Sequence, residues 1–318
     1  MHKILIAALL SMSLLSAASA LSPQDIKSQL DARDKKALVN AEAYAKANPN
    51  NAEAWILLTR ARLQAGKAEA AVASAERAVK LAPKNAQGQY WLGNAYGSRI
   101  GEVGMMSKMS MAPKLRHAFE STVALEPGNL DAREALLEYY LQAPAIAGGG
   151  KDRAVFQAKE IAKRDAARGH LAQARIYLNE ENANAALKSY EAAYAAKPDN
   201  ADIRLALGIA YQQSKRWADA YRHFRAWTKA DPKASQAWYQ IGRTGVLSGL
   251  QLEEGIAALQ IYLKLPRTGN EPQNQHAYYR MGQLYAKAGQ KASARAAFEN
   301  ALKLDPGFKD AKDELAKL

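Results

Sequence analysis

The sequence predicts an all-α protein in which pairs of helices stack into a solenoid. Prolines close successive apolar stretches, and Pro49 lies 34 residues before Pro83. The same spacing of 34 residues separates Pro198, Pro232 and Pro266. A fixed period of about 20–50 residues is typical of solenoids, because one helix pair cannot bury its apolar face without neighbours. Apolar residues make up 48% of the 318 residues, a share that excludes disorder of the whole chain.

The first 20 residues have the pattern of a cleaved secretory signal peptide. Lys3 gives a basic start, residues 4–16 are apolar or small, and Ala18, Ser19 and Ala20 form a small-x-small cleavage motif. An uncleaved membrane helix is the alternative, but spanning a bilayer takes about 20 apolar residues. We therefore expect cleavage after Ala20 and a soluble protein in the periplasm of a Gram-negative cell. We expect neither a lipid anchor, since the chain has no Cys, nor a later transmembrane segment.

The positions between the prolines follow one pattern in each period. In one period Leu207, Gly208 and Tyr211 share a face of a first helix, and Ala220 and Phe224 lie on a second helix. Gly208 lets the two helices approach closely, and Phe224 fills the space beside it. This pattern resembles the tetratricopeptide repeat, with its W-x2-L-G-x2-Y…A-x3-F…P consensus. The resemblance implies a right-handed α-solenoid whose concave face, lined by the first helix of each repeat, holds a protein or peptide partner.

Eight repeats account for residues 22–306. The first is divergent and starts at Ser22, with Pro23 at the first helical position. Proline is favourable there because it lacks a backbone N–H and the first N–H of a helix has no partner within the helix. The charged C-terminal segment suits a capping helix that faces water. We expect repeats at 22–51, 52–85, 86–129, 130–166, 167–200, 201–234, 235–270 and 275–306, and the capping helix at 307–318.

Two repeats carry insertions between their paired helices, at residues 97–113 and 142–151. Insertions in solenoids usually form loops on one face, where binding residues often lie. The second insert ends in the glycine-rich segment 148–151, which invites comparison with a phosphate-binding loop. The Walker phosphate-binding pattern requires a Gly at the position of Ala145 and a Ser or Thr at the position of Asp152, so this chain lacks both. We therefore interpret the segment as a turn before a helix.

The first insert contains four of the seven methionines of the chain, Met105, Met106, Met109 and Met111. Thioethers are soft ligands that suit Cu(I), whereas Met also fills irregular apolar gaps or contacts partners. The sequence favours packing or partner contact over a copper site. An accessory protein that handles metal through residues 105–111, or glycan through its basic surface, stays open as the alternative function.

The sequence contains no recognisable catalytic or cofactor site. It lacks Cys, which excludes zinc–thiolate sites, iron–sulfur clusters and Cys nucleophiles. The four histidines beyond the leader, at positions 117, 170, 223 and 276, fall in separate repeats, and neither H-E-x-x-H nor G-x-S-x-G occurs. We therefore expect a non-catalytic scaffold or adaptor of the bacterial envelope, without a cofactor.

By resemblance, set positions of each first helix point into the concave face. Arg and Tyr are common anchors at interfaces, and Arg binds a carboxylate through two parallel hydrogen bonds. The 44 Lys and Arg against 31 Asp and Glu give a net charge of +13, which can attract an acidic partner or an anionic surface, although an ordinary solvated basic surface is the favoured interpretation; export argues against nucleic acid. For any one position, an ordinary solvated side chain is the alternative. The expected partner-binding residues are Arg60, Tyr90, Asn94, Arg175, Tyr239, Arg243, Tyr279 and Gln283.

Overall fold

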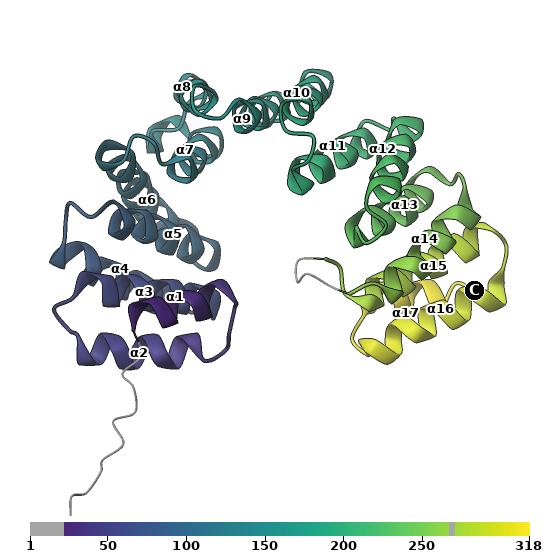
Figure 1. Cartoon of the computed structure of the whole chain (residues 1–318), viewed down its shortest axis with the longest axis horizontal. Helices are drawn as coiled ribbons and strands as arrows, with labels where there is room; N and C mark the ends of the chain where they lie inside the picture. The colour runs from purple at the N-terminus through teal and green to yellow at the C-terminus, as the bar shows by residue number, and fades with distance from the viewer. Residues whose placement is uncertain (1–21, 267–270) are drawn as a thin grey trace, which may run out of the picture. The chain divides into compact units, whose positions relative to one another are not determined.

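The computed structural model describes residues 22–266 and 271–318, and this part of the chain is all-α (Figure 1). It contains seventeen α-helices and one short 3-10 helix, and these residues form no strand. The all-α prediction is therefore confirmed. The predicted leader, residues 1–20, lies outside the described residues. In the same part of the chain, no helix combines the length and the apolar character needed to cross a membrane.

The chain divides into two compact units, with the boundary between Gly149 and Gly150, inside the second predicted insert. Unit 1 contains α1 (Pro23–Asp31), α2 (Ala37–Ala47), α3 (Ala52–Gln64), α4 (Ala68–Leu81), α5 (Ala86–Glu102), α6 (Met105–Leu125), α7 (Leu130–Gln142) and η1 (Ala145–Ala147). Unit 2 contains α8 (Lys151–Ala162), α9 (Ala166–Asn179), α10 (Ala183–Ala196), α11 (Ala201–Gln213), α12 (Trp217–Ala230), α13 (Ser235–Ser248), α14 (Leu252–Lys264), α15 (Asn274–Lys287), α16 (Lys291–Leu304) and α17 (Lys309–Leu315).

Asparagine caps explain where several first helices begin. Each cap follows a repeat-ending proline by two residues, and its side chain accepts a hydrogen bond from a backbone N–H of the first helical turn. That N–H has no partner within the helix, so the cap satisfies it. The caps are Asn51 of α3, Asn85 of α5, Asn129 of α7 and Asn200 of α11.

The carbonyl of the repeat-ending proline is held by a side chain six residues further along the chain. The indole N–H of Trp55 donates to the Pro49 carbonyl at 2.9 Å. The turn between repeats has the same construction in four further places. Trp238 donates to Pro232, Gln89 to Pro83, Arg133 to Pro127 and Arg204 to Pro198.

A glycine allows the two helices of a repeat to touch. A Cβ on Gly208 of α11 would lie 2.1 Å from the Cζ of Phe224 in α12, far closer than two carbon atoms can approach. Phe224 is fully buried, and the buried Ala220 lies one turn before it. The roles that the sequence predicts for Gly208 and Phe224 are therefore confirmed.

First helices of neighbouring repeats pack on each other within each unit, α1 on α3 and α3 on α5 in unit 1, and α11 on α13 and α13 on α15 in unit 2 (Figure 1). Among the described residues, no two second helices of neighbouring repeats pack to a comparable extent. When helices pack more closely along one side of a stack, the stack curves toward that side, which becomes its concave side. We call this side the first-helix face, formed by α1, α3 and α5 in unit 1 and by α11, α13 and α15 in unit 2.

Tyrosine–glutamate hydrogen bonds connect second helices to the first helix that follows. The hydroxyl of Tyr96 in α5 donates to the carboxylate of Glu76 in α4 at 2.7 Å. Burial and this carboxylate raise the pKa of Tyr96, so its hydroxyl stays a donor at neutral pH. Two other repeats contain the same bond over the same 20 residues, from Tyr140 to Glu120 and from Tyr211 to Glu191.

The insert at 97–113 is helical, so the expectation of a loop is wrong. α5 continues to Glu102 and α6 begins at Met105, which leaves two residues between them. Pro113 lies inside α6, where it removes one backbone hydrogen bond without ending the helix. The extra residues therefore lengthen both helices, and the packing of α5 on α6 stabilises the longer pair.

The insert at 142–151 is irregular, as expected. η1 follows Pro144, and Gly148 has a φ of +86°, a left-handed conformation that glycine adopts readily. The hydroxyl of Tyr139 donates to the Ala147 carbonyl at 2.5 Å and attaches this turn to α7.

Candidate partner-binding site

Three of the predicted partner-binding residues belong to first helices of unit 2, although the ring of Tyr279 also packs against Phe298 of α16 and Phe308. Arg243 belongs to α13, and Tyr279 and Gln283 belong to α15 of the next repeat. Each of the three is partly exposed. Because α13 packs on α15, this part of the face combines side chains from two repeats.

A buried polar network holds Arg243 in place. Its guanidinium donates to the Oε1 of Gln212, a residue that is only 2% exposed. The Nε2 of Gln212 donates in turn to the hydroxyl of Thr244 at 2.9 Å and to the carbonyl of Gln240 at 3.2 Å. A buried amide that is paired on both sides fixes the orientation of the guanidinium before any partner binds.

A second guanidinium, that of Arg280 in α15, lies near Arg243. Burial and the charge of Arg280 lower the pKa of Arg243. Arg280 donates to the Oε1 of Gln283 at 3.1 Å, and its guanidinium lies 5.8 Å from the ring centre of Tyr279. Within residues 22–266 and 271–318, neither arginine forms an ion pair with a carboxylate. Two neighbouring cations without a counter-charge can accept an external carboxylate, which Arg binds through paired N–H groups.

Arg280 is not among the partner-binding residues that the repeat pattern predicts. The repeat pattern assigns the position of Tyr279 to the concave face, and Arg280 is the next residue along the helix. One feature of the sequence could have indicated its role: Arg280 follows Arg243 by 37 residues, which is close to one repeat period.

Tyr239 is a correction to the predicted site. It lies in α13, is 6% exposed, and packs against Tyr262 with 5.1 Å between the ring centres. Its ring belongs to the core between α13 and the helices α14 and α15. A side chain buried to this degree has little surface to offer a partner.

In unit 1 the predicted residues contact other side chains or backbone groups of the stack. Arg60 of α3 pairs with Asp31 of α1 at 2.9 Å, and its guanidinium lies 5.2 Å from the ring centre of Trp91 in α5. The ring of Tyr90 meets the ring of Trp91 edge to face, and Asn94 donates to the Tyr90 carbonyl at 2.8 Å. Arg60 therefore contacts the first helices on both sides of it, whereas the hydrogen bond of Asn94 stays within α5, and partner binding by these residues stays a prediction.

Arg175 lies in α9 of unit 2 and is partly exposed. Burial raises the pKa of Tyr190 in the next helix, and the positive charge of Arg175 opposes that rise. Arg175 is thus near Tyr190, two first helices before α13 in chain order.

The four methionines of the first insert lie in the first two turns of α6. An α-helix advances about 100° per residue, which places Met105, Met106 and Met109 within one arc and Met111 well outside it. The first three are exposed, and Met111 is half-buried. Across the described residues, no group of three or more His, Asp or Glu is placed to hold a metal ion. A Cu(I) site at these thioethers stays a prediction, and the helix can offer three of the four on one side.

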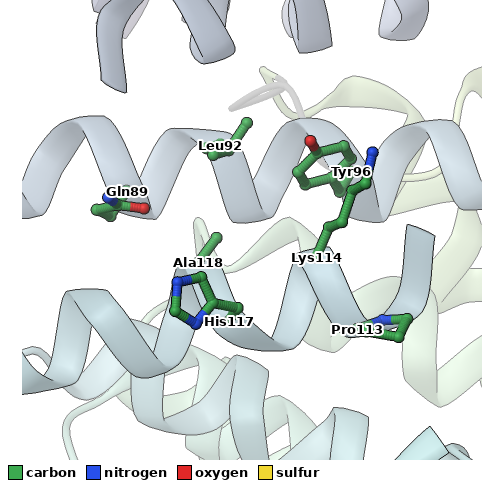
Figure 2. Close-up of a pocket in the computed structure, with 7 residues that line it drawn as sticks. All are labelled: Gln89, Leu92, Tyr96, Pro113, Lys114, His117 and Ala118. Carbon is green, nitrogen blue, oxygen red and sulfur yellow. The ribbon is translucent and has the colours of Figure 1, made fainter. Parts of the chain in front are cut away.

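A hollow of about 350 Å³ lies between α5 and α6. Figure 2 shows the residues that line it. Lys114 extends from α6 toward Tyr96 of α5, and its Nζ lies 5.9 Å from the centre of the ring. Gln89 at the other end of the hollow donates to the Pro83 carbonyl. Both Tyr96 and Gln89 thus serve the contacts between repeats described above, and we assign this hollow no binding role.

Comparison with known proteins agrees with the repeat architecture. Three family models, each described as a tetratricopeptide repeat, match residues 35–86 and 57–96, 177–241, and 275–308, and together they cover about half of the chain. No curated protein matches the chain significantly.

Solved structures with the same fold include two bacterial proteins. A thermophilic tetratricopeptide repeat protein of Thermus thermophilus superposes with a TM-score of 0.50 at 22% identity, over 59% of this chain and 98% of its own. A tetratricopeptide repeat protein from Parabacteroides merdae has a TM-score of 0.51 at 13% identity, over 83% of this chain and 97% of its own. With its proline-closed helix pairs and the matching family models, the chain belongs to the tetratricopeptide repeat family.

Proposed function

We propose that the protein is a non-catalytic scaffold that binds a protein or peptide partner on the first-helix face of unit 2. The observation that carries this proposal is the pair of guanidiniums of Arg243 and Arg280, which lack a carboxylate among the described residues. The buried network around Gln212 orients Arg243, and Gln283 accepts a hydrogen bond from Arg280, so binding costs the scaffold little ordering entropy.

The partner that fits this pair is acidic at the contact point. A carboxylate between two guanidiniums gains charge-assisted hydrogen bonds from both, and Tyr279 adds an amphipathic ring beside them. The net charge of +13 steers acidic molecules toward the protein over roughly one Debye length, about 8–10 Å at physiological salt. Affinity for such a partner should therefore fall as salt rises.

The predicted signal peptide supports a periplasmic location for this scaffold, and the partner would then belong to the bacterial envelope. Mass spectrometry of the protein recovered from the periplasm tests the location. A mature chain that begins at Leu21 is the expected result, and a chain retained in the cytoplasm with Met1 would contradict it.

Affinity capture from envelope extract, with matched variants, tests the binding face. The double variant Arg243→Gln/Arg280→Gln removes the pair. The control Arg222→Gln/Arg295→Gln removes the same charge from the exposed surfaces of the second helices α12 and α16. We expect one protein to be retained at stoichiometric level by the wild type and the control, and lost from the double variant.

Equal retention by both double variants would move the partner-binding surface elsewhere on the protein. If a partner is identified, each single variant at the pair should weaken its affinity by about 1–2 kcal/mol, as expected for an interfacial anchor.

A further inference from the structure

The two insertions meet at an apolar hollow in unit 1, separate from the proposed site in unit 2. The hollow has a volume of about 720 Å³, and α5, α6, α7 and η1 form its walls. Ile100, Met109, Phe119, Tyr139 and Ile146 provide much of its apolar lining. The lengthened helices α5 and α6 and the irregular turn after α7 contain the two insertions, and together they build this one feature. We call it the insert groove.

The rim of the insert groove exposes large apolar side chains. Met105 is 72% exposed, Met109 60% and Ile146 91%. Adjacent apolar side chains that are this exposed mark interaction surfaces. A small molecule is held in a site that buries most of it, and a ligand inside the hollow would leave these rim residues in water. A larger partner covers the hollow and its rim together.

The charged residues of the insert groove indicate which charge the partner carries. Lys108 lines the hollow and is half-buried, and within the described residues its ammonium makes no hydrogen bond or ion pair. The other charged residue of the lining, Glu138 of α7, accepts a hydrogen bond from Gln142 of its own helix. When a partner excludes water from the groove, the ammonium of Lys108 needs a counter-charge. The complement of this groove is therefore an apolar surface with an acidic group.

The shape of the groove favours a helix. The first part of α6 that lines the groove, residues 105–112, is about 12 Å long, which corresponds to two turns of a docked helix. Strand addition requires the edge of a sheet, and the described residues contain no strand. Methionines at the rim adapt their shape to a helical surface because their side chains are unbranched and flexible.

We propose that the insert groove binds the apolar face of an amphipathic helix from a partner protein. The helix places apolar side chains at positions i, i+3 or i+4, and i+7 into the hollow, and an Asp or Glu beside them faces Lys108. This interaction uses other residues than the first-helix face of unit 2, so the protein has two separate docking surfaces.

Selection from a phage-displayed library of random 16-residue peptides against the purified protein tests this proposal. We expect enriched peptides with the apolar spacing given above and an acidic residue, and we would measure their affinities as synthetic peptides by fluorescence polarisation. Met109→Glu and Ile146→Glu should each weaken binding at least tenfold, because they place a carboxylate against the apolar face. Both residues are exposed, so the variants should keep the far-ultraviolet circular dichroism of the wild type.

Matched variants separate the groove from other surfaces. Met109→Leu should bind as the wild type does. Leu304→Glu, which changes an exposed leucine of α16 in unit 2, should also leave the affinity unchanged. Lys108→Glu should weaken binding severalfold, and exchange of the peptide's acidic residue for Lys should restore it. The Arg243→Gln/Arg280→Gln variant should bind these peptides normally, so that this test and that of the proposed function can fail independently.

The proposal is overturned if no enriched peptide depends on Met109 and Ile146, or if Lys108→Glu binds as tightly as the wild type. Three further assays compare the wild type with Met109→Glu and test other occupants of the groove. If the wild type binds dodecanoate and the variant does not, the occupant is an acyl chain. If only the wild type binds phosphatidylglycerol vesicles, the occupant is a membrane surface, and if only the wild type shows concentration-dependent sedimentation, the occupant is a second copy of the chain.

Discussion

Replacement of Gly93 by alanine tests the tight packing inside a repeat. Gly93 lies in the middle of α5, and a Cβ there would sit 2.7 Å from Cε1, 2.8 Å from Cζ and 2.9 Å from Cδ1 of Phe119 in α6. Phe119 is 4% exposed, so its ring has little room to move away. Gly88, five residues earlier in the same helix, offers a control, because a Cβ there would meet its neighbours at an ordinary 3.8 Å.

The two variants share one effect and differ in another. Alanine in place of glycine within a helix stabilises by up to about 1 kcal/mol at either position. Only the methyl group added by Gly93→Ala forces its neighbour to shift, and such overpacking costs about 1–3 kcal/mol. The free energy of unfolding should therefore be about 1–3 kcal/mol lower for Gly93→Ala than for Gly88→Ala, and Gly88→Ala should equal or exceed the wild type.

Urea unfolding followed by circular dichroism measures the difference. Both residues belong to α5, so they report on the same region of the stack. A Gly93→Ala protein as stable as Gly88→Ala would refute the close approach of α5 and α6. Addition of Phe119→Leu to Gly93→Ala should recover part of the lost stability, because the smaller side chain removes the clash.

Three further predictions concern caps, contacts between repeats and pH. Asn200→Ala should lower the free energy of unfolding by about 1 kcal/mol through loss of the helix cap, with Asn200→Ser near wild type, and an unchanged thermal midpoint would contradict this. Tyr96→Phe should cost about 0.5–1.5 kcal/mol in urea unfolding, and Glu76→Gln, which keeps an acceptor, should cost less. Burial lowers the pKa of His223, so the unfolded chain binds a proton more readily and stability should decline as pH falls below about 6.5. His223→Gln should flatten that decline between about pH 6.5 and 5 in a series of urea titrations, and an identical slope would exclude this histidine as its cause.

Much of the fold was predictable because its signals are local and periodic. A proline follows most of the second helices, and in four repeats an Asn two residues later caps the next first helix, so the spacing of Pro49 and Pro83 predicts where helices stop and start. Gly208 and Phe224 act through one contact that recurs in register. Such features need no knowledge of distant parts of the chain.

The parts that were not predictable depend on contacts between elements. The insert at 97–113 contains Pro113, yet it is helical because two long helices stabilise each other by packing. Tyr239 occupies a position that the repeat pattern assigns to the open face, but its neighbour Tyr262 and the next repeat cover it. Arg280 gains its importance only from its closeness to Arg243, which the stacking of α13 and α15 creates.

The proposed binding face can be tested most directly by site-specific photo-crosslinking in the cell. A benzophenone amino acid in place of Gln283 lies beside Arg280 on the first-helix face, and the same amino acid in place of Glu299 lies on the exposed side of the second helix α16. We expect a crosslinked partner from position 283, none from position 299, and loss of the crosslink in the Arg243→Gln/Arg280→Gln background. A crosslink from position 299 alone, or one from position 283 that persists without the two arginines, would contradict this expectation.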